Sequence, residues 1–185
     1  MKVAMNIQTN RLHLRSLNAE DATETYVGWL NDPAVNQFLE TRHATQTIDS
    51  CKQFITTCNN SETEHLFGIF LKSTGAHIGN AKLGCINLIH QRGEISLFIG
   101  DKAQWGKKLA TEVVTALTSY GFNNLGLEKI EAGCYQDNIG SLRTFLGIGY
   151  TVEGFFRSHS NLNSDTRSGC FWLGMLKSEH ITNGK

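Results

Sequence analysis

The segment from Gly100 to Glu112 is the part of the sequence whose residue types point most directly to chemistry. It reads GDKAQWGKKLATE and joins an apolar, strand-like run to a long helical pattern. The start of a helix exposes backbone N–H groups without intrahelical partners and carries partial positive charge, so it can hold a phosphate. Lys107 and Lys108 would add positive charge there. A plain strand–helix turn with solvated lysines explains the same residues, and both interpretations stay open at this point.

The elements expected around this segment form a mixed sheet flanked by helices. From the apolar periodicity we expect strands at about 11–16, 65–71, 77–88, 93–100, 128–134, 150–157 and 169–176. Helices are expected from a cap at Asn18 or Asp21 to about Leu30, from Pro33, and at about 47–58, 105–122 and 139–147. Strands and helices are interspersed without strict alternation, so we predict an α+β fold with helices on both faces of a mixed sheet.

Length, charge and cysteine content limit the class of protein. The 185 residues suit one domain, and 17 basic residues balance 17 acidic ones, so we expect no general attraction to nucleic acid or to a membrane surface. The five cysteines are odd in number and lack C-x-x-C spacing, which disfavours a disulfide framework or a metal site. Without a signal-peptide core or a run of 18 apolar residues, the sequence predicts a cytoplasmic protein.

Several short motifs, taken in order, resemble one family. WGKKLATE at 105–112 is similar to the pyrophosphate arm of the GCN5-related N-acetyltransferases, the GNAT superfamily, and NIGSLR at 138–143 with GYTVEG at 149–154 resembles that family's second cofactor segment. The motif TNRLHLR at 9–15 and the turn NDPAV at 31–35 resemble the branch that includes ribosomal-protein and spermidine acetyltransferases. The resemblance covers roughly residues 8–177.

The resemblance implies a three-layer α/β/α fold around a strongly twisted sheet of six or seven strands, and one acyl-CoA N-acyltransferase domain over 1–185. Two neighbouring parallel strands, here 93–100 and 128–134, would separate to admit acetyl-CoA as co-substrate, without a metal. The backbone N–H groups from Trp105 to Ala110 would hold the pyrophosphate, and Asn138 would contact the pantetheine. The predicted cofactor-binding residues are Trp105, Gly106, Lys107, Lys108, Leu109, Ala110, Thr111, Asn138, Ser141 and Arg143.

Two residues depart from the family pattern. Lys108 replaces the central glycine of the pyrophosphate arm, which keeps the backbone N–H but adds a side chain beside the phosphates. Phe145 occupies the place of a tyrosine that many relatives use as general acid, and phenylalanine cannot donate a proton. The loop geometry and the protonation of the leaving thiolate therefore need another explanation.

The candidate catalytic residues are Glu94 and Ser141. Glu94 lies on the strand before the pyrophosphate arm, opposite its apolar face, where a carboxylate can accept a proton from an amine. If Asn138 caps the following helix, Ser141 lies in the first turn and can hydrogen-bond the leaving sulfur. A solvated glutamate and simple local capping are the alternatives.

The acceptor pocket is expected from residues 29–43 and from the turn at about 157–168. Its candidate lining residues are Trp29, Glu40, Arg42 and Arg157, with core packing or ordinary surface positions as alternatives. The polar turn is long enough to reach a substrate or a partner subunit, so a homodimer stays open.

The sequence thus predicts an N-acetyltransferase that moves acetyl from acetyl-CoA to a primary amine of a small molecule, of amino sugar or polyamine type. A protein N-terminal acetyltransferase of ribosomal-protein type is one alternative. The other is a non-catalytic CoA-binding module.

Overall fold

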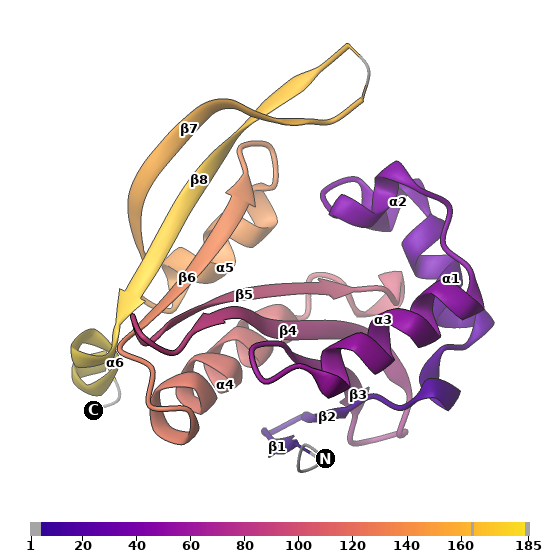
Figure 1. Cartoon of the computed structure of the whole chain (residues 1–185), viewed down its shortest axis with the longest axis horizontal. Coiled ribbons are helices and arrows are strands. Elements are labelled where there is room, and N and C mark those ends of the chain that lie inside the picture. The colour runs from indigo at the N-terminus through magenta and orange to yellow at the C-terminus, as the bar shows by residue number, and fades with distance from the viewer. Residues whose placement is uncertain (1–4, 164, 184–185) are drawn as a thin grey trace.

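One eight-stranded sheet organises the chain in this computed structural model, which describes residues 5–163 and 165–183 (Figure 1). The strands follow the order β1-β2-β3-β4-β5-β6-β8-β7. Their bounds are β1 Asn6–Gln8, β2 Leu12–Ser16, β3 His65–Leu71, β4 His77–Asn87, β5 Arg92–Ile99, β6 Lys129–Tyr135, β7 Thr151–Asn161 and β8 Arg167–Leu176. The mixed α/β fold is confirmed, but the predicted six or seven strands were too few. The unexpected strand is β1, whose three residues are too short to show an alternating pattern.

Several of the helices begin at a residue whose side chain caps the first turn. Their bounds are α1 Glu24–Asn31, α2 Pro33–Asn36, α3 Ile48–Asn60, α4 Leu109–Asn124, α5 Ile139–Gly147 and α6 Lys177–Asn183, with 3-10 turns η1 Ala19–Asp21, η2 Glu40–His43 and η3 Lys102–Gln104. Thr47 starts α3 by accepting from the Ser50 N–H, and Asp32 starts α2 by accepting from the Ala34 N–H. The long helix α4 starts at Leu109, so the expected start at 105 was wrong.

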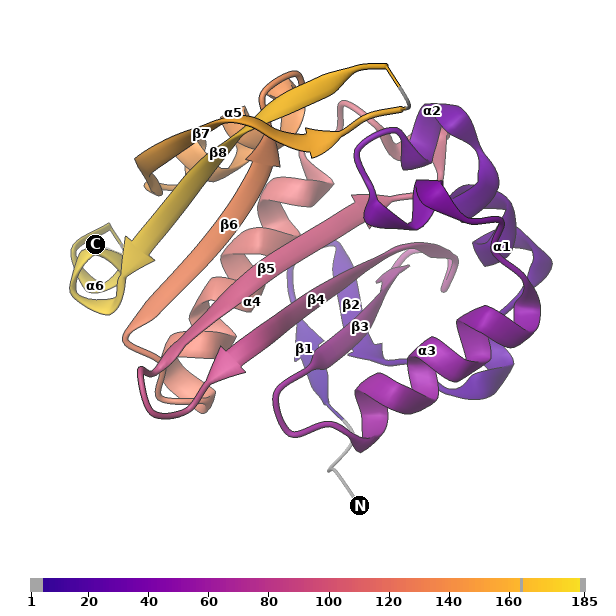
Figure 2. The same cartoon turned by 45° about the horizontal axis from the view of Figure 1, so that its top comes forward.

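Two apolar clusters fill the space on the two faces of the sheet. One lies under α4 and α5 and includes Val113, Leu117 and Ile130, all fully buried. The other joins the opposite face to α1 and α3 through residues such as Tyr26 and Ile55. Figure 2 shows α3 in front of the sheet and α4 behind it. The three-layer arrangement fixes which side chains of each strand face which helices.

The parallel strands β5 and β6 pair only where they begin. Their register joins Arg92 to Lys129, Gly93 to Ile130 and Glu94 to Glu131, and no further pair follows. Beyond these positions β5 stays with β4 as far as Ile99, while β6 stays with β8 as far as Tyr135. The strands therefore separate toward their carboxyl ends, and the backbone groups between them are left for another partner.

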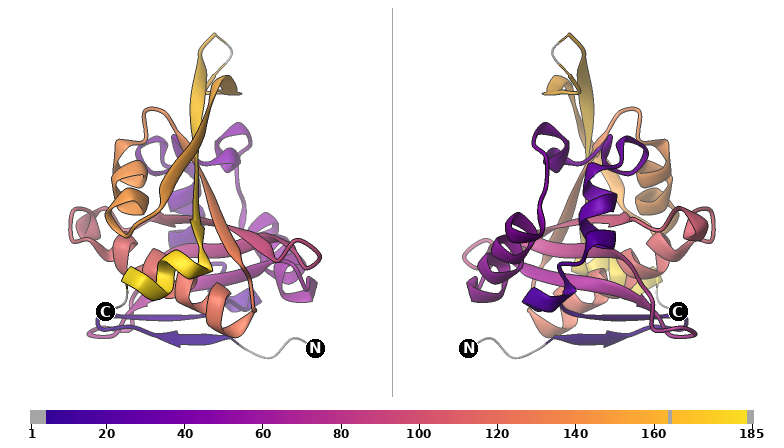
Figure 3. Two further views of the ribbon diagram at one scale, coloured as in Figure 1. Left: turned by 90° about the vertical axis from the view of Figure 1, so that its left-hand side faces the viewer. Right: turned by 90° about the vertical axis from the view of Figure 1, so that its right-hand side faces the viewer.

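The hairpin of β7 and β8 projects beyond the rest of the sheet, as both views of Figure 3 show. The polar segment expected as a turn at about 157–168 is largely strand, since pairing continues as far as Asn161 and Arg167. Within the residues described, no helix has the length and apolar character needed to cross a membrane.

Gly100, at the end of β5, packs directly against an aromatic ring. A Cβ added there would lie 2.1 Å from Trp29 Cδ2, whereas a Cβ at Gly28, within α1, would have nothing within 4 Å. We expect Gly100→Ala to lower the free energy of unfolding by about 1–3 kcal/mol through overpacking. Gly28→Ala should raise it by about 0.5–1 kcal/mol because alanine favours the helix. Urea unfolding of both variants tests this, and equal effects would contradict the close approach of Trp29.

Candidate functional site

The loop before α4 presents its backbone toward a cavity. Gly106 has φ +75° and Lys108 has φ +59°, so two residues in the left-handed region turn the chain immediately before the helix. Lys108 is the N-cap of α4 and makes no side-chain capping bond. The N–H groups of the first helical turn have no intrahelical partners, which suits an anionic ligand.

The start of α4 is fixed to the N-terminal strands by Glu112. Its Oε1 accepts from Thr9 Oγ1 at 2.5 Å and from the Arg11 backbone N–H at 2.7 Å, and its Oε2 accepts from Arg11 Nε at 2.8 Å. Arg11 Nη1 also donates to the Lys107 carbonyl at 2.9 Å. Burial raises the pKa of Glu112, but these hydrogen bonds outweigh it and lower the pKa below the ordinary value. The loop is therefore fixed to the N-terminal strands on one side, while Gly106, Lys108 and Leu109 line a cavity on the other.

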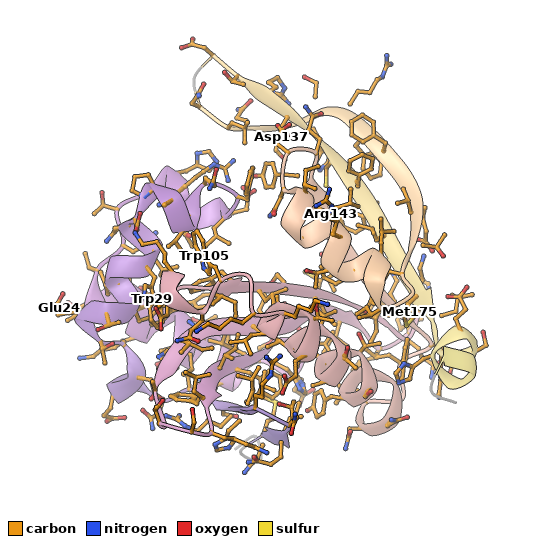
Figure 4. The ribbon with its side chains drawn as sticks, turned by 180° about the vertical axis from the view of Figure 1, so that it is seen from behind. Glu24, Trp29, Trp105, Asp137, Arg143 and Met175 are labelled. Atoms are coloured by element: carbon orange, nitrogen blue, oxygen red, sulfur yellow. The ribbon has the colours of Figure 1, made fainter. Side chains whose placement is uncertain are left out.

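A cavity of about 700 Å³, here called the α4 chamber, lies between this loop and α5. Figure 4 labels Trp105 and Arg143, which border it from the two sides. Trp105 is anchored because its Nε1 donates to the Ile99 carbonyl at 2.7 Å. Nine of the ten predicted cofactor-binding residues line this chamber: Trp105, Gly106, Lys108, Leu109, Ala110, Thr111, Asn138, Ser141 and Arg143. The tenth, Lys107, extends instead to Gln104 Oε1 at 3.0 Å.

Asn138 caps α5, as expected, by accepting from the Ser141 N–H at 3.2 Å. The Ser141 hydroxyl lies in the first turn and is 3.2 Å from Cys134 Sγ on β6. Burial raises the pKa of the Cys134 thiol, so this neighbour is uncharged at neutral pH. The Ser141 hydroxyl thus lies near the positive end of a helix and contacts an uncharged thiol, that of Cys134.

A second cavity of about 480 Å³, here called the α3 chamber, runs across the sheet face toward α3. Its lining includes Ser96 and Lys82 of the sheet and Phe54 of α3. The residues that line both chambers are Phe38, Leu39, Leu97, Phe98, Asn138 and Ser141. The chambers therefore meet at the opening between β5 and β6, beside Ser141.

Glu94 lies at the base of this opening, on the same face of β5 as Ser96. It is half-buried and is not among the residues that line either chamber. Burial, followed by the charge of Glu131, raises the pKa of Glu94 above its ordinary value. Glu131 itself is also desolvated, but hydrogen bonds from Arg92, Trp172 and Lys129 lower its pKa. Glu94 is therefore the more basic of the two carboxylates.

Of the four predicted acceptor-binding residues, Glu40 borders the α3 chamber. It accepts a hydrogen bond from the Tyr135 hydroxyl. Arg42 serves the framework, because its guanidinium donates to the carbonyls of Leu39 at 2.7 Å and of Asn161, and to the Tyr135 hydroxyl at 2.9 Å. Only 9% of its side chain is exposed. Arg42 thus ties the η2 loop to the projecting hairpin.

The other two predicted acceptor residues lie elsewhere. Trp29 packs against Gly100, His77 and Phe98, and Arg157 is exposed on β7. Neither is among the residues that line the two chambers. Trp29 therefore packs against the end of β5, which leads into the loop before α4.

The sequence offered no sign of Tyr135 as a site residue. Tyr135 follows the last core residue of β6 and lines the α3 chamber, where burial and its bond to Glu40 raise the pKa of its hydroxyl. An aromatic residue at the end of a strand is common and does not by itself indicate a binding site. Only the position of β6 beside the opening shows that Tyr135 lines a chamber. In residues 5–163 and 165–183, no group of three or more histidine, cysteine or acidic side chains is arranged to hold a metal ion.

The left-handed conformation of Lys108 gives a test of the loop geometry. A non-glycine residue in the left-handed region destabilises the folded state by about 1–2 kcal/mol. Glycine removes this strain, but part of the gain is lost because glycine has more conformational freedom in the unfolded chain. We expect Lys108→Gly to raise the free energy of unfolding by about 0.5–1 kcal/mol. Lys108→Ala removes the same charge but keeps the strain, so it should change stability by less than about 0.5 kcal/mol. Equal gains in thermal unfolding would show that the charge, not the backbone, is responsible.

Comparisons with known proteins agree with this geometry. A family model described as "Acetyltransferase (GNAT) domain" matches residues 11–151. An uncharacterized N-acetyltransferase of Bacillus licheniformis, p20, is 30% identical over 156 residues, which cover 83% of this chain and 86% of that protein. Spermidine N(1)-acetyltransferase of Escherichia coli K12 is 29% identical over 114 residues, or 60% of this chain and 61% of that protein.

Among solved structures, the chain resembles spermidine N-acetyltransferase from Vibrio cholerae in complex with CoA and spermine. The TM-score is 0.83 at 20% identity, covering 94% of this chain and 99% of the other, which is a likeness of fold. The matched model spans the strands that separate, the loop before α4 and the cap of α5. This chain therefore belongs to the GNAT family of N-acetyltransferases.

Proposed function

We propose that this chain transfers acetyl from acetyl-CoA to a primary amine of a small molecule, of amino sugar or polyamine type. The observation that supports this most directly is the meeting of two chambers at the opening between β5 and β6. One chamber ends at the amide-lined start of α4, and the other is enclosed by side chains of α3 and the sheet. A two-substrate transfer needs such a junction, because both reacting groups must be brought together.

Acetyl-CoA, when bound, supplies the acetyl group as an activated thioester. Backbone N–H groups from Gly106 to Ala110 would hold its pyrophosphate, and the unpaired edge of β5 would bind its pantetheine arm. The Trp105 N–H, also expected at the pyrophosphate, donates instead to the Lys102 carbonyl at 3.2 Å. Gly106 supports this assignment because its positive φ turns the chain without a side chain toward the phosphates. Arg143, exposed on α5, would add positive charge across the α4 chamber.

Glu94 is the proposed general base. An alkylammonium with a pKa near 10 costs about 4 kcal/mol to deprotonate at pH 7, so a proton acceptor is needed. Glu94 lies two residues from Ser96 on one strand face, and only Ser96 reaches the α3 chamber. We therefore propose that a water molecule carries the proton from the amine to Glu94. The raised pKa of Glu94 makes it a better base than an ordinary glutamate.

Ser141 is proposed to hydrogen-bond the departing thiolate. Its position in the first turn of α5 places it near the positive end of a helix and at the boundary of both chambers. Phe145 also borders the α3 chamber, and its ring packs 5.0 Å from that of Tyr150 in the core. A thiol with a pKa near 8.5 leaves tolerably as the anion, so a hydrogen bond without full proton transfer is sufficient.

A cytoplasmic location is part of the proposal. All five cysteines carry free thiols, and four of them are buried. A reducing compartment preserves such thiols.

The proposed function has a direct test. Acetyl-CoA at 100 times its dissociation constant should stabilise the protein by about 2.7 kcal/mol, and EDTA should not change that shift. CoA release should then appear with small amines and exceed the release with peptide N-termini. No stabilisation at millimolar acetyl-CoA would refute the assignment of the α4 chamber. Acetyl transfer to peptides but not to small amines would show that the acceptor is a protein N-terminus rather than a small molecule.

The two proposed catalytic residues should differ in their pH dependence. Glu94→Gln should slow transfer by about 10²–10⁴-fold near neutral pH, and the loss should shrink at higher pH, where the amine deprotonates in solution. Ser141→Ala should raise the barrier by about 1–3 kcal/mol at every pH, because the hydroxyl does not titrate in this range. The measurement is the transfer rate of both variants as a function of pH, with acetyl-CoA affinity as the control for intact binding. A Glu94→Gln loss that is independent of pH would reject Glu94 as the base.

A further inference from the structure

Two buried polar atoms beside the α3 chamber have no hydrogen-bond partner of normal geometry within residues 5–163 and 165–183. They are Asn80 Nδ2 and Thr41 Oγ1, and both residues border the chamber. Asn80 is only 3% exposed. An unpaired buried donor costs about 1–3 kcal/mol, so its retention at a ligand cavity indicates a partner supplied by the ligand.

His77 fixes the orientation of the Asn80 amide. His77 Nε2 lies 3.0 Å from the Gly79 carbonyl oxygen and 2.8 Å from Asn80 Oδ1. Both neighbours are acceptors, so Nε2 must carry the hydrogen. Turning the amide over would place its N–H₂ group against that N–H. Asn80 therefore keeps its oxygen toward His77, and its nitrogen points away from it.

The imidazole that sets this orientation is itself held firmly. Burial lowers the pKa of His77, so the ring is neutral at neutral pH. Its ring stacks on Phe70 with centroids 4.7 Å apart and meets Trp29 edge-on at 5.2 Å. The donor at Asn80 is thus positioned by a rigid aromatic cluster rather than by a mobile loop.

The two side chains beside the Asn80 amide, the His77 ring and the Tyr26 hydroxyl, are uncharged at neutral pH. The Tyr26 hydroxyl lies beside Asn80. Burial raises the pKa of Tyr26 above its ordinary value, and the side-chain contact with Asn80 opposes this only in part. That contact does not give Nδ2 a hydrogen bond of normal geometry. Of the charged residues that line the chamber, Lys82 is ion-paired with Glu64 at 2.5 Å, and Glu40 accepts a hydrogen bond from Tyr135. A neutral N–H donor suits an oxygen with lone pairs and repels an ammonium group.

We propose that Asn80 is a specificity-determining residue whose N–H₂ group binds an uncharged oxygen of the acceptor, with Thr41 as a second hydrogen-bonding group. The acceptor is then an amine that also carries a hydroxyl, ether or carbonyl oxygen, rather than a purely aliphatic polyamine. This inference rests on the proposed function, because it assigns the α3 chamber to the acceptor.

Matched pairs of amines test the inference. The parent enzyme is assayed with glucosamine against cyclohexylamine, and with 5-aminopentanol against pentylamine and 1,4-diaminobutane. We expect the best oxygen-bearing amine to exceed its oxygen-free counterpart at least about 10-fold in kcat/KM, since a site built to hydrogen-bond an oxygen rejects analogues without it. A clear preference for the oxygen-free amines would overturn the inference.

Variants locate the preference in the chamber. Asn80→Asp keeps the oxygen toward His77 but replaces the donor by a carboxylate oxygen, so the preference should fall by about 10-fold or more. Asn87→Asp makes the same change on the same strand but outside the chamber, so it should leave the preference for oxygen-bearing amines unaltered. Thr41→Val should reduce the preference by about 3–10-fold, and it carries the test if Asn80→Asp does not fold. An unchanged preference in both chamber variants contradicts the assignment.

The outcomes separate this inference from the function on which it rests. If the parent enzyme transfers acetyl to none of the amines, the proposed small-molecule function fails, and the inference fails with it. If it transfers acetyl readily but prefers oxygen-free amines, the function stands and only the role of Asn80 is rejected. Acetyl-CoA-dependent stabilisation of each variant confirms that folding and the α4 chamber are intact.

Discussion

The separation of β5 and β6 is the constraint on which the site depends. Three paired positions hold the strands together, after which each remains bonded only to its outer neighbour. Unpaired strand edges inside a protein normally carry a cost in free energy. Here β5 stays paired with β4, and β6 with β8, beyond the point where they separate. The opening is therefore part of the pairing pattern of the sheet, and backbone groups of both strands are left for a ligand.

The loop before α4 keeps its shape because several distant segments fix it. Glu112 bonds to Thr9 and Arg11, Trp105 bonds to the end of β5, and Trp29 packs on Gly100 behind that end. These contacts join the N-terminal strands, α1 and α4 around one short turn. The proposed phosphate site consists mainly of backbone N–H groups and would depend on such support, since its geometry cannot be adjusted by side-chain rotation.

The sequence predicted the layered fold, most strands and the cap of α5, because these depend on local periodicity and capping residues. It placed the start of α4 four residues too early, since nothing in the residue types shows that Lys108 takes a left-handed conformation. The contact of Glu112 with Thr9 joins residues 103 apart and leaves no local pattern. Arg42 was predicted to bind the acceptor from its charge, whereas the carbonyls of Leu39 and Asn161 that accept its hydrogen bonds could not be identified from the sequence.

The charges around the opening explain why one carboxylate differs from the others. Among the acidic side chains described with a clear shift, Asp21, Asp32, Glu112 and Glu131 have a lowered pKa, and each is held by an arginine or a lysine. Glu94 shares the desolvation but faces the charge of Glu131, whose own cations are already engaged. Replacing Arg92 would weaken the hold on Glu131 and remove a charge that favours ionised Glu94. The proton affinity of the proposed base is thus set first by burial and then by the ion pairs at the paired start of β5 and β6.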